Sequence, residues 1–108
     1  MPTINYSFSE SDIETILYTL TILPTLELED TDAQASINYQ CCLSASEKLS
    51  LHRTDILPNE FRVILASLEA AQLINQGGLN VDSKVRKECS NYLFSINKLV
   101  SVFEKQLS

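Results

Sequence analysis

The residues best suited to metal binding or nucleophilic catalysis are a single histidine, His52, and three cysteines, Cys41, Cys42 and Cys89. Zinc sites take their ligands in matched sets with a few residues between paired ligands, and this sequence has no such spacing. Adjacent helical residues point about 100° apart, so Cys41 and Cys42 do not easily share one ion. We therefore expect no metal site and no cofactor, and we expect all three thiols to be at least partly buried.

Nucleophilic catalysis by a cysteine needs a histidine within hydrogen-bond distance. Cys41 and His52 are eleven positions apart, which spans about 16 Å along a helix. The carboxylate and histidine units of di-iron bundles are missing from the sequence, and so are the glycine and ligand spacing of a calcium loop. We therefore expect that this protein is not an enzyme.

His52 also suggests phosphotransfer signalling. The chain resembles histidine phosphotransfer domains in being small, acidic and helical with one histidine, and in those domains the relay histidine lies in mid-helix, followed closely by a lysine and a small residue. Here the residues 51–55, LHRTD, lead into a loop before Pro58, so the motif of the relay histidine is missing. The alternative interpretation is a histidine at a helix end, where the helix dipole favours a cationic side chain. Phosphotransfer through His52 remains an alternative function.

Length and composition indicate one folded domain. The chain has 108 residues, 44% of them hydrophobic, which suffices for one core and leaves no room for a second domain. We therefore expect a single domain over residues 1–108, with a short N-terminal arm at 1–9. Two adjacent glycines are too few for a glycine-rich phosphate loop.

The charge of the chain is uneven. Its net charge is −6, but residues 1–47 contain eight acids and no Lys or Arg, whereas residues 48–108 contain eight bases and six acids. Residues 1–12 have neither the positive charge nor the apolar run of a signal peptide, and the uncharged stretch 15–26 is shorter than the ~20 apolar residues of a membrane span. We therefore expect a cytoplasmic protein with reduced thiols and no membrane contact.

Apolar spacing predicts four helices. The first helix is capped by Ser9 or Ser11 and ends at Pro24, and the second runs from Asp30, Thr31 or Asp32 to about Leu51. The third helix runs from Pro58 to Gln76 and stops at Gly77. The fourth helix is capped by Asn80 or Asp82 and continues to about Leu107. On the second helix the expected core face is Ala35, Tyr39, Cys42, Leu43 and Leu49. The fold class is therefore all-α, an up-and-down bundle of four helices in one domain.

The third predicted helix has apolar residues on two opposite faces. Phe61, Ile64, Leu65, Leu68 and Ala71 form one face, and the second comprises Val63, Ala66, Ala70, Leu73 and Ile74. Such a helix requires neighbours on both sides. Either it lies at the centre of the domain, or the second face is the interface of a homodimer.

The fourth predicted helix places Phe94 opposite its apolar face, beside Lys87 and Lys98. An exposed aromatic side chain is typical of an interface anchor, although the N-terminal arm offers an alternative cover through Tyr6 and Phe8. We therefore predict a small acidic interaction or regulatory protein, a self-associating homodimer that binds another protein. A second alternative is nucleic-acid binding through Lys84, Arg86 and Lys87, which the negative net charge disfavours.

Overall fold

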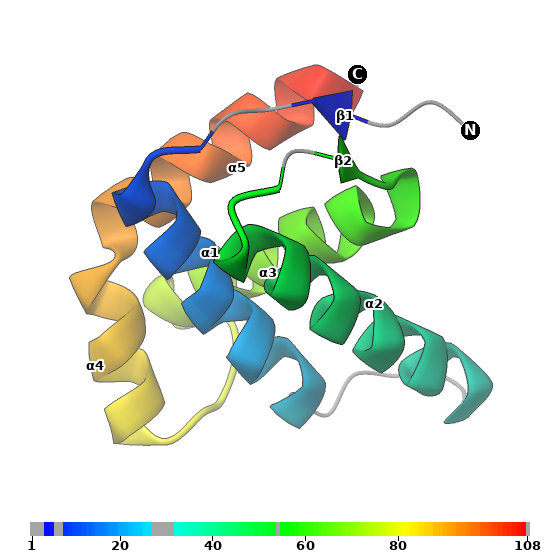
Figure 1. Ribbon diagram of the computed structural model, residues 1–108. Coiled ribbons are helices and arrows are strands. Elements are labelled where there is room, and N and C mark those ends of the chain that lie inside the picture. Colours follow the sequence, from blue (N-terminus) through cyan, green and yellow to red (C-terminus); the bar gives the residue numbers. More distant parts are fainter. Residues whose placement is uncertain (1–3, 6–7, 27–31, 54, 108) are drawn as a thin grey trace.

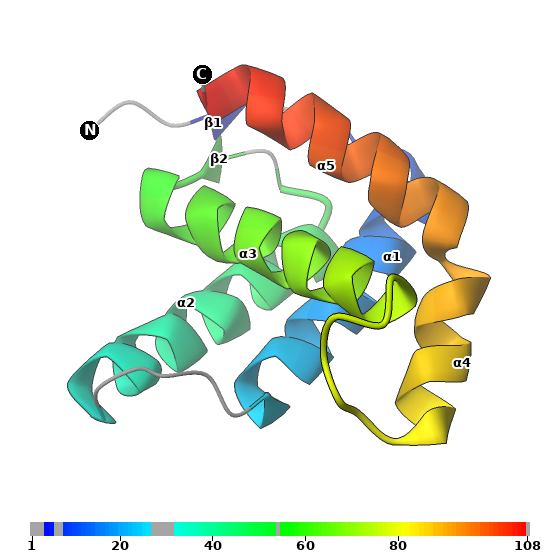
Figure 2. The ribbon, with the colours of Figure 1, turned by 180° about the vertical axis from the view of Figure 1, so that it is seen from behind.

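The computed structural model describes residues 4–5, 8–26, 32–53 and 55–107 (Figures 1 and 2). This part of the chain contains five α-helices, which confirms the all-α class and corrects the predicted number of four. The helices are α1 Glu10–Ile22, α2 Asp32–Ser50, α3 Pro58–Asn75, α4 Ser83–Asn91 and α5 Leu93–Leu107. A 3₁₀ turn, η1 Leu23–Thr25, follows α1, and the two-residue strands β1 Ile4–Asn5 and β2 Asp55–Ile56 pair antiparallel.

The central element is α3, which contacts α1, α2, α4, α5 and η1. In Figure 2, α3 lies between α5 and α2. Both of its apolar faces pack against other parts of the same chain, since Phe61, Ile64 and Leu68 on one side and Ile74 on the other are fully buried. Of the two arrangements that the sequence allows, this monomer therefore has α3 at its centre.

The helix ends follow local sequence signals. The side chain of Ser9 accepts a hydrogen bond from the amide of Asp12 at 3.1 Å, and Pro58 occupies the first turn of α3, as predicted. Gly77 adopts a left-handed conformation with φ of 79°, and the next amide, that of Gly78, donates to the carbonyl of Leu73 at 2.8 Å. This left-handed turn closes α3 where the glycine predicts it.

The prediction of one continuous helix from residue 83 to 107 is wrong, because the chain turns a corner at Tyr92, where φ is −104° and ψ is 9°. A straight helix of that length would extend about 37 Å, against about 27 Å for α3. The corner lets α4 and α5 both pack on α3 (Figure 2). The Tyr92 ring stacks on Tyr18 of α1 with centroids 5.0 Å apart. Leu93, which the apolar spacing of one continuous helix puts on the same face as Ile96 and Leu99, is 44% exposed.

The predicted core face of α2 is correct only toward the end of that helix. Cys42 and Leu49 are buried as predicted, but Tyr39 and Leu43 are 48% and 49% exposed. Ala45, which is not part of the predicted face, is fully buried. Residues 33–37 are exposed, because the first turns of α2 project beyond the helices it packs against (Figure 1). Packing with α3 and α1, rather than the apolar pattern of α2 alone, decides which side faces inward.

The N-terminal arm is attached to the domain at two points. Ile4 pairs with Ile56 in the short ladder, and the ring of Phe8 packs against Phe103 of α5 with centroids 5.7 Å apart. Phe103 in turn contacts Phe61 of α3 edge-on at 4.4 Å. Within the described residues, no helix has the length and apolar character needed to cross a bilayer.

Candidate functional site

Phe94 is the most exposed large hydrophobic side chain in the described part of the chain, at 86%. Leu93 precedes it at 44% exposure, and Lys98 follows one helical turn later on the same side of α5. The Lys98 ammonium donates to Asp12 Oδ1 of α1 at 3.0 Å. We call Leu93, Phe94 and Lys98 the Phe94 surface.

The sequence predicts Lys87 beside Phe94 and offers the N-terminal arm as an alternative cover, and the fold places both Lys87 and Phe8 elsewhere. Lys87 is exposed on α4, on the other side of the corner at Tyr92, so the helical spacing that placed it beside Phe94 does not extend to it. Phe8 packs on Phe103 and not on Phe94. Tyr6 lies outside the described residues. Phe94 therefore stays exposed while Phe8 contributes to the core.

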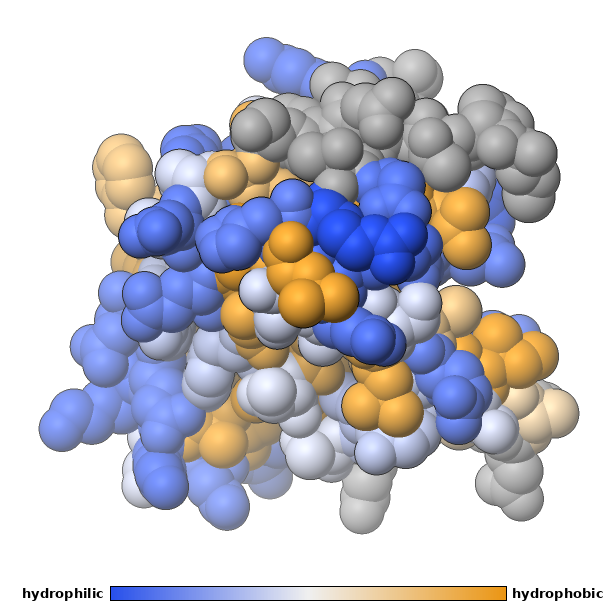
Figure 3. All heavy atoms as spheres, viewed as in Figure 1, coloured by the Kyte–Doolittle hydropathy of each residue, from blue (hydrophilic) through white to orange (hydrophobic). Residues whose placement is uncertain are grey.

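The second face of α3 is largely covered by the chain itself. Val63, Ala70 and Ile74 are 7%, 8% and 0% exposed, whereas Ala66 is exposed and Leu73 is 45% exposed. Two of the five residues predicted for a dimer interface are thus available at the surface. On the face seen in Figure 3, apolar side chains form small separate groups between hydrophilic ones, with no broad apolar plane.

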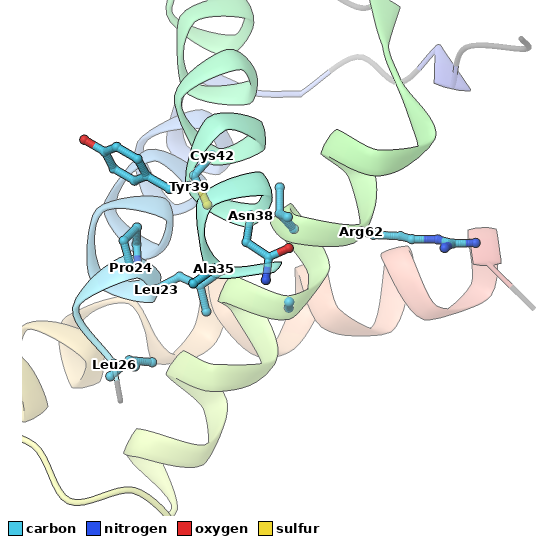
Figure 4. Close-up of a pocket in the computed structure, with 10 residues that line it drawn as sticks. Leu23, Pro24, Leu26, Ala35, Asn38, Tyr39, Cys42 and Arg62 are labelled. Carbon is cyan, nitrogen blue, oxygen red and sulfur yellow. The ribbon is translucent and has the colours of Figure 1, made fainter. Parts of the chain in front are cut away.

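A groove between η1, α2 and α3 forms a cavity of about 510 Å³ (Figure 4). In Figure 4, Asn38 points between α2 and α3, whereas the hydroxyl of Tyr39 points away from them. Sequence reasoning missed this groove because it joins three separate segments; its only signal is that part of the predicted apolar face of α2 lines it. The described lining residues are Leu23, Pro24, Leu26, Ala35, Asn38, Tyr39, Cys42, Arg62, Val63 and Ala66.

All three cysteines are free thiols in chemically unreactive surroundings. Cys42 and Cys89 are buried and Cys41 is partly buried. Burial, together with the neighbouring Cys41, raises the pKa of Cys42 to about 11, and burial also raises the pKa of Cys41 and of Cys89. The thiolate is the nucleophilic form, so these side chains are poor nucleophiles at neutral pH.

His52 is exposed just after the end of α2, with a left-handed φ of 56°. Its amide donates to the carbonyl of Leu49 at 3.0 Å, which closes the last turn. The neighbouring Arg53 donates through Nε to Asp55 at 2.9 Å and forms an ion pair with it. His52 therefore lies in a helix-terminating turn, whereas a relay histidine lies in mid-helix, and phosphotransfer stays an untested prediction.

The basic start of α4 is exposed at Lys84, Arg86 and Lys87. Arg86 donates to the carbonyl of Leu79 at 3.4 Å, which ties this side chain to the preceding loop. Nucleic-acid binding through these residues also stays an untested prediction. Within the described residues, no three His, Cys, Asp or Glu side chains converge in a way that could hold a metal ion.

A comparison of the chain with protein-family models, with curated proteins and with solved structures finds no match. Any functional inference therefore depends on the geometry and charge of this chain. Within its described part, two surface features are suited to binding: the Phe94 surface on α5 and the groove between η1, α2 and α3.

Proposed function

We propose that this protein is a non-enzymatic binding module that recognises another protein through the Phe94 surface. The observation that supports this proposal is the 86% exposure of Phe94 on a regular helix whose opposite side is fully buried at Ile96, Leu99 and Phe103. Leaving an aromatic ring in water costs free energy, and buried aromatic side chains supply much of the binding energy at protein interfaces.

The chemistry of the Phe94 surface defines the partner. Burying one Phe side chain contributes about 1.5–3 kcal/mol, equivalent to roughly a tenfold to hundredfold gain in affinity. Lys98, whose side chain is 52% exposed despite its contact with Asp12, adds a cation one turn away. A matching partner has an apolar pocket with a carboxylate at its edge. We expect a small interface, because the exposed apolar side chains around the domain are scattered.

A second copy of this chain is one such partner, so self-association stays part of the proposal. Because Val63, Ala70 and Ile74 are buried within the monomer, a homodimer would use Phe94, or the exposed Ala66 and Leu73, in place of the complete second face of α3. Sedimentation velocity of the purified chain at micromolar concentration separates a monomer of 12.1 kDa from a dimer. The same run with Phe94→Ala tests whether that ring is in the contact.

The test of the binding proposal compares the wild-type protein and two variants in extracts of the native host. The quantity measured is the size of the assembly in which each protein migrates under native conditions. Phe94→Ala removes the anchor, and Leu43→Ala removes an exposed apolar side chain of α2 that is 49% exposed. We expect the wild type and Leu43→Ala to migrate in one larger assembly and Phe94→Ala to migrate close to the monomer. Equal migration of all three proteins contradicts the proposal.

A further inference from the structure

The segment 83–107 contains no helix-breaking residue, yet α4 and α5 meet at a corner within it (Figure 2). Glycine and proline, which account for most sharp bends in helices, are missing from residues 79–108. Buried residues continue through the corner at the spacing of one amphipathic helix, namely Cys89, Ile96, Leu99 and Phe103. The sequence of this segment therefore favours a continuous helix, and the corner comes from packing against the rest of the domain.

The corner occupies a single residue. Tyr92 has φ of −104° and ψ of 9°, against about −63° and −42° in a regular α-helix. The amide of Tyr92 donates to the carbonyl of Cys89 at 3.1 Å, and the amide of Ile96 donates to the carbonyl of Tyr92 at 2.8 Å. Main-chain hydrogen bonds therefore continue on both sides of the corner. Rotations of about 40° in φ and about 50° in ψ at Tyr92 convert it into regular helix.

The contacts that hold the bent form come from α1 and α3. Cys89 is the one buried residue of α4, all of whose residues the structure describes. The side-chain amide of Asn75 on α3 donates to the carbonyl of Cys89 at 3.1 Å. The Tyr92 ring stacks on Tyr18 of α1, and its hydroxyl donates to Glu14 Oε1 at 3.4 Å. A change in these few contacts therefore shifts the balance between the corner and a continuous helix.

The connection between α3 and α4 is long enough for α4 to leave α3. Residues 76–82 are seven residues, which span up to about 23 Å when extended. The nine residues of α4 are about 14 Å long. Straightening at Tyr92 therefore moves α4 outward while α3 and α5 stay packed together.

We infer that residues 83–107 have two forms, the bent form seen in the structure and a continuous helix, and that the continuous form completes the partner-binding surface around Phe94. In a continuous helix Lys87, Phe94 and Lys98 lie within about 40° of one another, whereas the bent form places Lys87 on the other side of the corner. This inference rests on the proposed binding role of Phe94. A partner with an apolar pocket and carboxylates on both sides of it contacts both lysines only in the continuous form, so it stabilises that form.

The two forms differ in the distance between Ser83 on α4 and Ser101 on α5, both of which are exposed. These residues are 18 positions apart, so a continuous helix separates them by five turns, about 27 Å, and the bent form brings them closer. Spin labels attached to p-acetylphenylalanine at these two positions leave the three cysteines unchanged. Double electron–electron resonance then measures the distance in the full chain.

The equilibrium is shifted by variants outside the labelled segment. Tyr18→Ala removes the ring on which Tyr92 stacks. Asn75→Ala, which removes the hydrogen bond to Cys89, is a second variant should Tyr18→Ala lose its helical circular dichroism. Tyr39→Ala, a half-exposed tyrosine of α2, is the matched control.

We expect a minor population at about 27 Å in the wild type and in Tyr39→Ala. This population should be at least threefold larger in Tyr18→Ala and Asn75→Ala, because loss of one aromatic or hydrogen-bond contact changes an equilibrium several-fold. The short distance alone in every variant overturns the inference. A broad distance distribution with a loss of helical circular dichroism also overturns it, because α4 then unfolds and does not straighten.

The role of the continuous form in binding is tested with two exposed cations of α4. Lys87→Gln removes one end of the completed surface, and Arg86→Gln removes a cation about 100° away on the same helix. In extracts of the native host we expect Lys87→Gln to lower the share of the chain in the larger assembly at least threefold and Arg86→Gln to leave it unchanged. Equal effects of the two variants overturn that role. The distance measurement uses the chain alone, so failure of the two-form inference and failure of the protein-binding proposal are separate results.

Discussion

The ammonium of Lys48 lies 2.7 Å from Oε1 of Glu60, and this ion pair joins the last turns of α2 to the first turn of α3. Glu60 also accepts hydrogen bonds from the amide of Leu57 at 2.9 Å and from the hydroxyl of Ser44, and Lys48 donates to the carbonyl of Asp55 at 3.0 Å. Both charged groups are mostly buried, with side-chain exposures of 13% and 3%. This buried network holds the connection that orients α3, the helix at the centre of the domain.

The first prediction concerns acid stability. Burial raises the pKa of Glu60, but the hydrogen bonds from Lys48, Ser44 and Leu57 outweigh burial and leave this pKa below its ordinary value. Ionised Glu60 therefore stabilises the fold above the unfolded-state pKa of about 4.3, and this contribution is lost as the pH falls through the lower folded-state pKa. We expect the free energy of unfolding, measured with urea, to decrease as the pH is lowered below about 4.3.

Lys48→Met isolates the contribution of the cation. Without it, burial dominates and the pKa of Glu60 rises above its ordinary value, so the variant loses about 3 kcal/mol at neutral pH and regains part of that loss on acidification. Arg53→Met, which removes the exposed pair with Asp55, is the control and should change stability little. A pH dependence of Lys48→Met parallel to the wild type would show that Lys48 does not set the ionisation of Glu60.

The second prediction concerns a polar contact inside the core. The hydroxyls of Thr19 on α1 and Ser67 on α3 are fully buried and 2.9 Å apart, and each also lies within 3 Å of a carbonyl of its own helix. We expect Thr19→Val and Ser67→Ala each to cost about 1 kcal/mol. The double variant should cost about 1 kcal/mol less than the sum of the two, because their shared bond is lost only once.

Thr15 provides the control for this double-mutant cycle. It is 1% exposed on α1 and donates to the carbonyl of Ser11 at 3.0 Å. Thr15→Val and Ser67→Ala should therefore combine additively. Equal coupling in the two cycles would mean that the Thr19 and Ser67 contact contributes no specific energy.

The third prediction compares two phenylalanines of α5. Phe103 is fully buried between Phe8 and Phe61, whereas Phe94 is 86% exposed. Phe103→Ala should lower the free energy of unfolding by about 3–5 kcal/mol, and Phe94→Ala should change it by less than about 0.5 kcal/mol. Thermal and urea unfolding measure both. A loss above about 2 kcal/mol for Phe94→Ala would place this ring among the residues that stabilise the fold.

The fourth prediction concerns the turn after α2. His52 has a left-handed φ of 56°, a conformation that costs a residue with a Cβ roughly 1–2 kcal/mol and costs glycine little. His52→Gly should therefore raise the free energy of unfolding by about 0.5–1 kcal/mol, because part of the gain is offset by the entropy of the unfolded chain. His52→Ala, which keeps the Cβ, should show no such gain in the same urea titration.

Features decided by a few neighbouring residues could be predicted from the sequence, and features decided by packing could not. Ser9, Pro58 and Gly77 determine helix ends through their own backbone and side-chain chemistry, so these ends were predicted correctly. The corner at Tyr92 depends on its stacking with Tyr18, far away in the sequence, and on the length of α3. No apolar periodicity contains that information.

The two candidate sites also differ in how far the sequence predicts them. The exposure of Phe94 follows from the spacing of buried residues along one helix, so the sequence predicts it. The groove depends on how η1, α2 and α3 meet. Leu23, Cys42 and Val63 therefore become neighbours in one lining only when the relative positions of these elements are known.

The most direct measurement of the central claim is site-specific photo-crosslinking in the native host, with p-benzoylphenylalanine at position 94. The photo-reactive residue retains the aromatic ring, and the same residue at the exposed position Glu69 of α3 is the control. We predict one protein adduct of defined mass from position 94, absent from position 69, with the mass distinguishing a second copy of this chain from another protein. No adduct from position 94, or the same adducts from both positions, would contradict the claim that Phe94 is an interface anchor.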